Sequence, residues 1–279
     1  MTAPAAGQPA ITVHLRHPQK SQGFSGVSAA ASGGGNFIHS LLGSPLTMSE
    51  RFFLTTPPQG TSALLEGDEA RHLTRVLRAK VGDTVALFDG RGHAWEARVA
   101  GIGRDKVTLD LGNALPTIPP PAVTVTLAVA LPKGDRQKWM VEKLTEMGVS
   151  RLVPLITTRG VAEATDSARS RLERGVVEAC KQCGRDSLME IAHAASIADL
   201  LAAAATGTRM LLADPLGRPP EAVLAAGPTA EILVLVGPEG GFTAEEVTAA
   251  EAAGCQRVTF GRHILRVETA AIAAAARLA

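Results

Sequence analysis

A glycine-rich loop that carries a carboxylate is the segment of this chain best suited to hold a ligand. The apolar run Leu233–Val236 leads directly into Gly237–Gly241, which has Glu239 at its centre. Glycine lets the backbone take positive φ and come close to a ligand. The loop lacks the lysine and the Ser/Thr hydroxyl of a P-loop, and its carboxylate disfavours a polyanion. These residue types therefore indicate a neutral or cationic ligand.

The elements around this loop must position it. Thr243 and Glu246 have the spacing of a capping box, which predicts that a helix begins there. A buried strand, a tight loop and a helix therefore follow one another, and open α/β sheets bind ligands at the carboxyl ends of their strands. A lone glycine loop is more often a plain strand-to-helix turn. A second glycine and polar loop within residues 260–269, again between a strand and a helix, favours a binding site.

Composition limits the class of protein. The 279 residues include 28 basic and 27 acidic side chains, which excludes a globally basic nucleic-acid binder and leaves local basic faces open. The chain has no Tyr and few other aromatic residues, so an extended base-stacking surface is not expected. No apolar run approaches the roughly 20 residues of a membrane span, and we expect no membrane association.

Cysteine usage indicates a reducing compartment. Cys180, Cys183 and Cys255 are an odd number in a long chain, unlike a secreted disulfide framework, so we expect a cytoplasmic protein. Cys180 and Cys183 form a C-x-x-C pair without a second pair or a nearby histidine at ligand spacing. We therefore expect no metal site and interpret the pair as small, partly buried residues of a helix.

Residues 1–47 differ from the rest of the chain. They are rich in Ala, Gly, Ser, Pro and Gln and have no sustained hydrophobic period, which is typical of a disordered tail. They lack the basic start and the apolar core of a signal peptide. We expect this segment to be non-catalytic and take Met48 as a candidate start of the protein proper.

Residues 48–117 have the pattern of a small β-barrel. Two predicted strands, 81–88 and 93–99, flank the glycine-containing turn Asp89–Gly92 as a hairpin, and residues 104–111 form a further strand. Before the hairpin, we expect one amphipathic helix, whose buried face carries Leu73, Val76 and Leu77 and whose other face carries Arg71, Arg75 and Arg78. Arginines at this spacing either track a phosphate backbone or form an ordinary solvated face.

A proline-rich segment separates this barrel from a second domain. Pro116–Pro121 predicts a stiff linker, and residues 118–279 alternate strands with helices. That order implies a mostly parallel sheet covered on both faces. The predicted strands are 123–130, 152–156, 210–214, 232–236 and 257–260, and the predicted helices are 133–147, 168–183, 244–253 and 268–279.

Basic residues gather at the junctions of these elements. Lys181 and Arg185 lie at the end of a predicted helix, where positive charge complements the helix dipole. Lys133 and Arg136 lie at the opposite, unfavourable end of their helix. Their position indicates an anionic partner.

Several motifs occur in a fixed order along the chain: Lys133–Arg136, Glu142–Val149, Ala179–Arg185, Gly237–Phe242 and Ile264–Ala270. Together they resemble the bacterial 16S ribosomal RNA (uracil-N3)-methyltransferase family, from about Arg51 to the C-terminus. That family belongs to the SPOUT class of S-adenosylmethionine-dependent enzymes. The resemblance implies an α/β fold, with a trefoil-knotted C-terminal SPOUT domain and an N-terminal PUA-like barrel that binds RNA. Topology rules alone would argue against a knot.

The resemblance also implies a function. The protein would methylate uracil N3 in 16S ribosomal RNA of the small ribosomal subunit, as a homodimer with an active site shared across the interface. The loops at 237–241 and 261–268 would lie side by side around a bent S-adenosylmethionine. The cofactor-binding residues would be Leu235, Gly237, Pro238, Glu239, Gly240, Gly241, Gly261, Ile264, Leu265 and Arg266. Departures from the family pattern, at Gly160, Cys183, His263 and Val267, bear on fine specificity.

Methyl transfer to uracil N3 requires alignment of donor and acceptor and removal of a proton from a weak acid. Glu268 and Glu239 are the candidate bases, and each has the alternative role of holding a loop through backbone N–H groups. Arg266 would steady the uracil oxygens as charge develops, or else pair with Glu268. The candidate RNA-binding residues are Lys133, Arg136, Arg159, Lys181, Arg185, Arg71, Arg75 and Arg78.

Two other functions stay open from the sequence. One is a different RNA methyl transfer on the same scaffold, for instance to a ribose 2′-hydroxyl. The other is a non-enzymatic RNA-binding or ribosome-assembly protein that keeps the fold.

Overall fold

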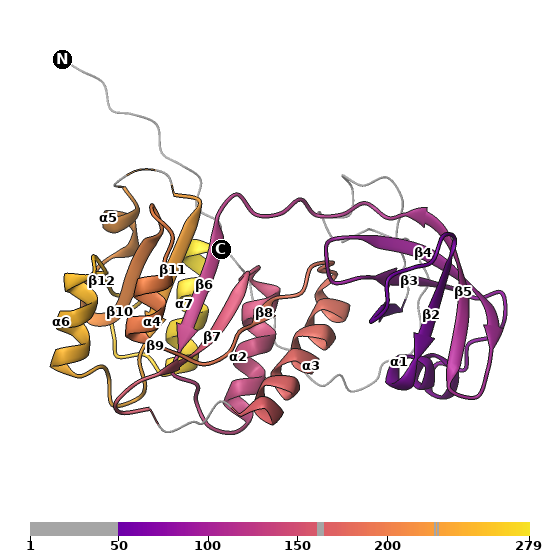
Figure 1. The fold of residues 1–279 in the computed structure, drawn as a ribbon, viewed down its shortest axis with the longest axis horizontal. Coiled ribbons are helices and arrows are strands. Elements are labelled where there is room, and N and C mark those ends of the chain that lie inside the picture. The colour runs from indigo at the N-terminus through magenta and orange to yellow at the C-terminus, as the bar shows by residue number, and fades with distance from the viewer. Residues whose placement is uncertain (1–49, 161–164, 226, 228) are drawn as a thin grey trace, which may run out of the picture. The chain divides into compact units, whose positions relative to one another are not determined.

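The computed structural model describes residues 50–160, 165–225, 227 and 229–279 (Figure 1). The predicted tail of residues 1–47 lies outside the described residues. The described chain forms one five-stranded sheet in its N-terminal part and one seven-stranded sheet in its C-terminal part.

The N-terminal sheet contains the predicted hairpin. Its strands are β1 (Arg51–Phe53), β2 (Ser62–Glu66), β3 (Thr84–Phe88), β4 (Ala94–Ile102) and β5 (Lys106–Ala114), in the order β1-β3-β4-β5-β2. The β3–β4 and β4–β5 pairs are antiparallel, which confirms the hairpin and the strand that follows it. Alternate side chains of the sheet, among them Leu65, Leu87 and Leu109, are fully buried against one another.

The helix of this part differs from its prediction. It begins as α1 (Gly67–Arg71) and continues as a π-helical turn, η2 (His72–Val76), in which the Leu77 N–H donates to the His72 carbonyl. The wider turn rotates the following residues relative to an α-helix. Leu73 is buried as predicted, but Val76, predicted on the buried face, is 69% exposed.

The C-terminal sheet is parallel throughout its described pairs, which confirms the predicted topology class. Its strands are β6 (Thr124–Val129), β7 (Arg151–Ile156), β8 (Glu190–Ile191), β9 (Ala195–Ser196), β10 (Arg209–Arg218), β11 (Glu231–Val236) and β12 (Gln256–Val258). The strand order is β12-β10-β11-β6-β7-β8, and β9 pairs with β7. The central strands read as nearly continuous apolar runs because both faces of a parallel sheet are covered.

Helices cover both faces of this sheet (Figure 1). They are α2 (Asp135–Glu146), α3 (Asp166–Cys183), α4 (Ile197–Ala203), α5 (Pro220–Leu224), α6 (Ala244–Ala252) and α7 (Val267–Leu278). Residues of α2, α3 and α7 share one core cluster with Leu127 and Val129, whereas residues of α4 and α6 share another with Ala128. Neighbouring residues of β6 therefore point into different cores.

The last segment of the chain returns from the sheet edge to its centre. β12 pairs with β10 at the edge, whereas α7, yellow in Figure 1, contacts β6, β11 and α2. Residues 259–266 make this return past the carboxyl end of β11. The trefoil knot stays a prediction. Within the described residues, the structure has no helix long and apolar enough to cross a membrane and no His, Cys, Asp and Glu cluster arranged to hold a metal.

Candidate active site

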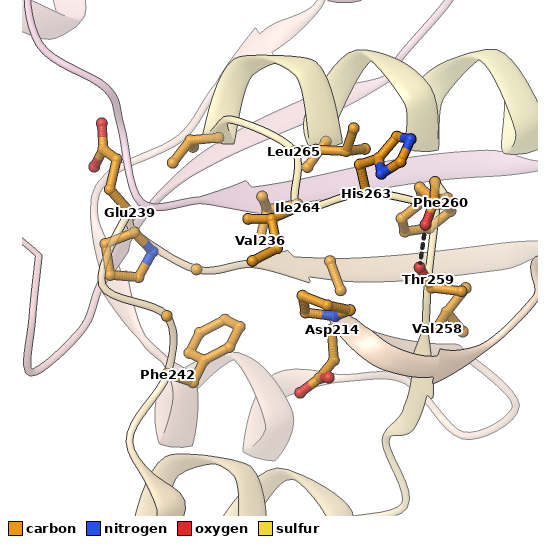
Figure 2. A pocket seen from close by; sticks show the side chains of 18 of the residues that line it. Asp214, Val236, Glu239, Phe242, Val258, Thr259, Phe260, His263, Ile264 and Leu265 are labelled. Carbon is orange, nitrogen blue, oxygen red and sulfur yellow. Dashed lines mark hydrogen bonds between the residues drawn. The ribbon is translucent and has the colours of Figure 1, made fainter.

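A pocket lies at the carboxyl ends of β10, β11 and β12 (Figure 2). Three segments form most of its walls: residues 213–215 of β10, the loop from β11 to α6, and the loop from β12 to α7. Apolar side chains make up much of the lining, including Val236, Phe242, Val258 and Leu265. This is the edge at which open α/β sheets bind ligands.

The structure brings together most of the predicted cofactor-binding residues. Those that line the pocket are Gly237, Pro238, Glu239, Gly241, Gly261, Ile264 and Leu265. Leu235, Gly240 and Arg266 are not part of the lining: Leu235 is fully buried within β11, and Arg266 is an exposed residue at the N-cap of α7. The two glycine loops thus face one pocket, and the individual contacts to a cofactor stay predictions.

Several lining residues escaped the sequence-based prediction. The lining residues absent from the predicted cofactor-binding set include residues of β10 and of the two loops: Asp214, Pro215, Phe242, Thr259, Phe260 and His263. For β10, the available local signal was the Asp214–Pro215 pair at the end of the predicted strand 210–214. This signal could be interpreted only with the knowledge that β10 lies between β11 and β12.

The β11–α6 loop owes its shape to glycine and to the capping box. A Cβ on Gly237 would lie 3.0 Å from the Phe242 ring, so glycine lets this aromatic wall pack closely onto the loop without a shift of the ring. Gly241 has φ +68° and its N–H donates to the Pro238 carbonyl at 2.8 Å. Thr243 and Glu246 exchange both hydrogen bonds of the predicted capping box, which begins α6 directly after the loop.

An irregularity at the end of β10 shapes the opposite wall. The register of β10 against β12 shifts between Ala213 and Arg218. Within the shift, the Asp214 carboxylate accepts from the Leu216 N–H at 2.7 Å and from the Arg257 guanidinium at 2.9 Å. A Cβ on Gly217 would lie 2.4 Å from the Val258 nitrogen. Glycine therefore lets the displaced strand pass directly against β12.

The β12–α7 loop completes the pocket. The Thr259 hydroxyl donates to the Gly261 carbonyl at 2.9 Å, as Figure 2 shows, and a Gly261 Cβ would lie 3.2 Å from the Leu265 side chain. Ile264 lines the pocket and is still 86% exposed. This loop therefore presents apolar surface both to the pocket and to solvent.

The two candidate carboxylates meet at one arginine. Arg136 Nη1 lies 3.3 Å from Glu239 Oε1 and 3.7 Å from Glu268 Oε2. Glu268 is 5% exposed, and its Oε2 has no hydrogen-bond donor among the described residues. Its place in the first turn of α7 favours negative charge. The predicted alternative, in which Glu268 pairs with Arg266, is wrong, because the ion-pair partner of Glu268 is Arg136.

Two candidate RNA-binding residues are engaged with protein groups near the end of α3. Lys181 is 11% exposed and donates to Glu69 at 3.0 Å and to Glu178 at 3.2 Å. Burial lowers the pKa of Lys181, but its hydrogen bonds and charge attraction to these carboxylates raise it above the ordinary value overall. Arg185 donates to the Thr145 carbonyl at 3.0 Å, and burial lowers its pKa. Phosphate would have to compete with these partners.

The other basic candidates are exposed and differ in their partners. Lys133, Arg75 and Arg78 are exposed, whereas Arg71 pairs with Asp68. Arg159 is exposed but donates to the Gly240 carbonyl at 2.7 Å. Binding of RNA phosphates by any of these side chains stays a prediction.

The lining chemistry fits the predicted cofactor. Apolar walls from Val236, Phe242 and Leu265 suit the ring of a nucleoside, and loop backbone groups supply donors and acceptors for its edges. Glu239 at the pocket suits a ligand with positive charge, such as a sulfonium or an ammonium group.

Known protein families match both parts of the chain. An RNA methyltransferase domain matches residues 119–279, and an RNA methyltransferase PUA domain matches residues 65–112. A Synechocystis protein named ribosomal RNA small subunit methyltransferase E is 32% identical, over 75% of this chain and 70% of that protein. The protein of the same name from Rickettsia conorii is 31% identical, over 77% of this chain and 88% of its own.

A solved structure is similar over most of both chains. It is the crystal structure of a ribosomal RNA small subunit methyltransferase E from Neisseria gonorrhoeae bound to S-adenosylmethionine, with a TM-score of 0.75 and 30% identity, covering 82% of this chain and 96% of that one. These matches confirm the predicted fold class, a SPOUT-type α/β domain preceded by a PUA-like domain. The chain belongs to the RNA methyltransferase family that includes these ribosomal RNA small subunit methyltransferases E.

Proposed function

We propose that this protein methylates uracil N3 in 16S ribosomal RNA of the small ribosomal subunit, with S-adenosylmethionine as the methyl donor. The pocket formed by the two glycine loops carries the proposal, since it combines apolar walls with a carboxylate. The similar Neisseria protein was crystallised with the same cofactor. The relatives' names state action on small-subunit ribosomal RNA.

The proposed cofactor site combines apolar side chains with the polar backbone groups of a loop. When bound, S-adenosylmethionine supplies a methyl group on a sulfonium sulfur, which needs no further activation. Phe242, Ile264 and Leu265 would enclose the apolar portion of the cofactor, and the backbone of 237–241 would bind its polar edges.

The chain must also remove the proton from uracil N3. Glu239 lines the pocket, whereas Glu268 is buried beside it and does not. We therefore assign Glu239 as the first candidate base and Glu268 as the residue that anchors Arg136 at the start of α7. Arg266, exposed at the N-cap of α7, would stabilise the negative charge that develops on the uracil oxygens.

RNA would be held by exposed basic side chains of both parts, with residues 48–117 as the RNA-binding barrel and residues 118–279 as the catalytic domain. Lys133 adjoins the start of α2, Arg75 lies in η2 of the barrel, and Arg78 follows η2. We also propose a cytoplasmic homodimer with a shared active site. The apolar side chains of Leu216 and Ile264, at 85% and 86% exposed, support a covered surface beside the pocket.

The function is tested by transfer of labelled methyl groups from S-adenosylmethionine to small ribosomal subunits that lack uridine N3 methylation. Nucleoside analysis of the product should contain labelled N3-methyluridine. Labelled 2′-O-methyl nucleosides would instead establish ribose methylation on the same scaffold. Calorimetry that detects no S-adenosylmethionine binding, together with no transfer, would overturn the enzyme hypothesis and favour a non-enzymatic RNA-binding or ribosome-assembly protein.

A further inference from the structure

The β11–α6 loop is contacted by an arginine that follows β7, two strands away from β11 in the sheet. Arg159 follows β7, and its Nη1 donates to the Gly240 carbonyl at 2.7 Å. Its Cδ lies 3.3 Å from the point that a Gly240 Cβ would occupy. Glu239 and Gly241, on either side of Gly240, both line the pocket, whereas Gly240 does not. Arg159 therefore contacts the loop at a residue that is not part of the pocket lining.

The segment that carries Arg159 is itself fixed to the start of α6. The Thr158 N–H donates to Glu246 Oε1 at 2.8 Å, and the other oxygen of the same carboxylate accepts from the Thr243 N–H at 2.8 Å. The Gly160 N–H closes a turn by donating to the Thr157 carbonyl at 3.1 Å. Glu246 thus joins the loop after β7 to the loop after β11. The backbone next to Arg159 is therefore fixed relative to the start of α6.

A second arginine contacts the adjacent loop residue. Arg136 Nη1 lies 3.3 Å from the Glu239 carboxylate and belongs to the first turn of α2. Two consecutive loop residues, Glu239 and Gly240, are therefore bound by arginines from two different segments, the start of α2 and the loop after β7. A glycine-rich loop without such contacts would lose much conformational entropy when it ordered around a ligand.

We propose that Arg159 is a positioning residue for the cofactor: by holding the Gly240 carbonyl, it keeps the loop 237–241 in the shape that receives S-adenosylmethionine. The inference rests on the proposed cofactor. It gives Arg159 a role that operates without RNA, in addition to the phosphate contact that its charge suggests. The side chain acts through Gly240 and does not touch the reacting atoms.

The direct test is isothermal titration calorimetry of the RNA-free protein with S-adenosylmethionine. Arg159→Ala should bind roughly 5- to 20-fold more weakly than the wild type, a smaller effect than for a buried charged hydrogen bond because Arg159 is exposed to solvent. Arg159→Lys should recover part of the affinity because the ammonium keeps a donor. The matched control is Arg174→Ala, which removes an exposed arginine of α3 that has no ion pair among the described residues.

A second variant approaches the contact from the loop. Gly240 does not have positive φ, so Gly240→Ala is allowed by the backbone, and its methyl group would displace the Arg159 side chain. We expect Gly240→Ala to weaken cofactor binding in the wild-type background and to have little further effect in the Arg159→Ala background. This non-additivity separates a specific contact from general loss of folding, which circular dichroism monitors in parallel.

Steady-state kinetics distinguish positioning from phosphate binding. Arg159→Ala should raise the KM for S-adenosylmethionine and leave kcat nearly unchanged at saturating cofactor. Equal cofactor affinity of the wild type and Arg159→Ala, with a raised KM for RNA alone, would overturn this inference and leave the proposed function standing. No binding of S-adenosylmethionine by the wild type would overturn both.

Discussion

Arg136 Nη1 lies 3.7 Å from Oε2 of Glu268, and this contact joins the start of α2 to the start of α7. Glu268 is 5% exposed, whereas the Arg136 side chain is 39% exposed and also reaches Glu239. A buried carboxylate depends on its cation more than a solvated one does. The pair therefore connects the stability of the C-terminal helix to the loop that lines the pocket.

Arg136→Ala should lower the free energy of unfolding by about 1–3 kcal/mol, because Glu268 would keep its buried charge without a cation; solvent near the half-exposed arginine reduces the full effect of a buried pair. Urea unfolding measures the change. Glu268→Gln in the Arg136→Ala background should recover most of the loss, since the amide carries no charge. Wild-type stability of Arg136→Ala would show that the pair contributes nothing.

Arg266→Ala should abolish methyl transfer, with a loss of about 100-fold or more in kcat, if its guanidinium stabilises charge on the uracil oxygens. The fold should survive because Arg266 is exposed at the N-cap and its side chain makes no cap hydrogen bond. Single-turnover transfer to small subunits is the measurement, and circular dichroism with cofactor calorimetry checks fold and binding. Near-normal turnover would remove Arg266 from the mechanism.

Gly217→Ala should destabilise the protein by about 2–3 kcal/mol, because its methyl group would meet backbone atoms of β12 that cannot rotate away. Thermal unfolding measures the loss, and weaker cofactor binding should accompany it, since Asp214 and Val258 line the pocket. Gly101→Ala is the matched control, because its Cβ would make an ordinary contact of 3.7 Å with the Thr108 hydroxyl. Equal stability of both variants would contradict the tight strand passage.

The exposed cysteine should react with alkylating reagents faster than the two buried cysteines. Burial raises the pKa of Cys180 to about 12 and that of Cys255 to about 11, whereas Cys183 is exposed. Iodoacetamide at neutral pH should therefore modify Cys183 in the native protein and all three cysteines after denaturation, as read by mass spectrometry. Rapid native labelling of Cys180 would contradict the packing of α3.

The same thiols predict a loss of stability in alkali. Below the ordinary cysteine pKa of 9.0, both folded and unfolded states keep these protons and the stability is unaffected. As pH rises above that value, the unfolded chain releases the protons of Cys180 and Cys255 while the folded protein retains them, so unfolding becomes more favourable. Urea unfolding at increasing pH should show the decline, and replacement of both residues by alanine should reduce it.

Local patterns predicted the central elements of the fold well. β11 was predicted as residues 232–236 and spans Glu231–Val236, and α6 begins at the predicted capping box of Thr243. Both signals arise within one short segment: a long apolar run and a side-chain cap. β8 and β9 have two residues each, too few for any hydrophobic period, and they form only because β7 offers a partner.

The candidate site was predicted only where its signals are local in sequence. Both loops have their glycines in the local sequence, but the contribution of Asp214 depends on the strand order, which no local pattern encodes. The partners of Lys181 and Arg159, Glu69 and Gly240, are likewise distant in sequence. A basic side chain signals an anionic neighbour, and only the fold decides whether that neighbour is a nucleic acid, a carboxylate or a carbonyl.

The lining of the pocket comes from residues between Ala213 and Ala270, and α7, which supports it, ends at Leu278. β6, against which α7 packs, is synthesised much earlier. Because α7 packs against β6, which lies far earlier in the chain, the pocket is complete only once elements distant in sequence have packed together.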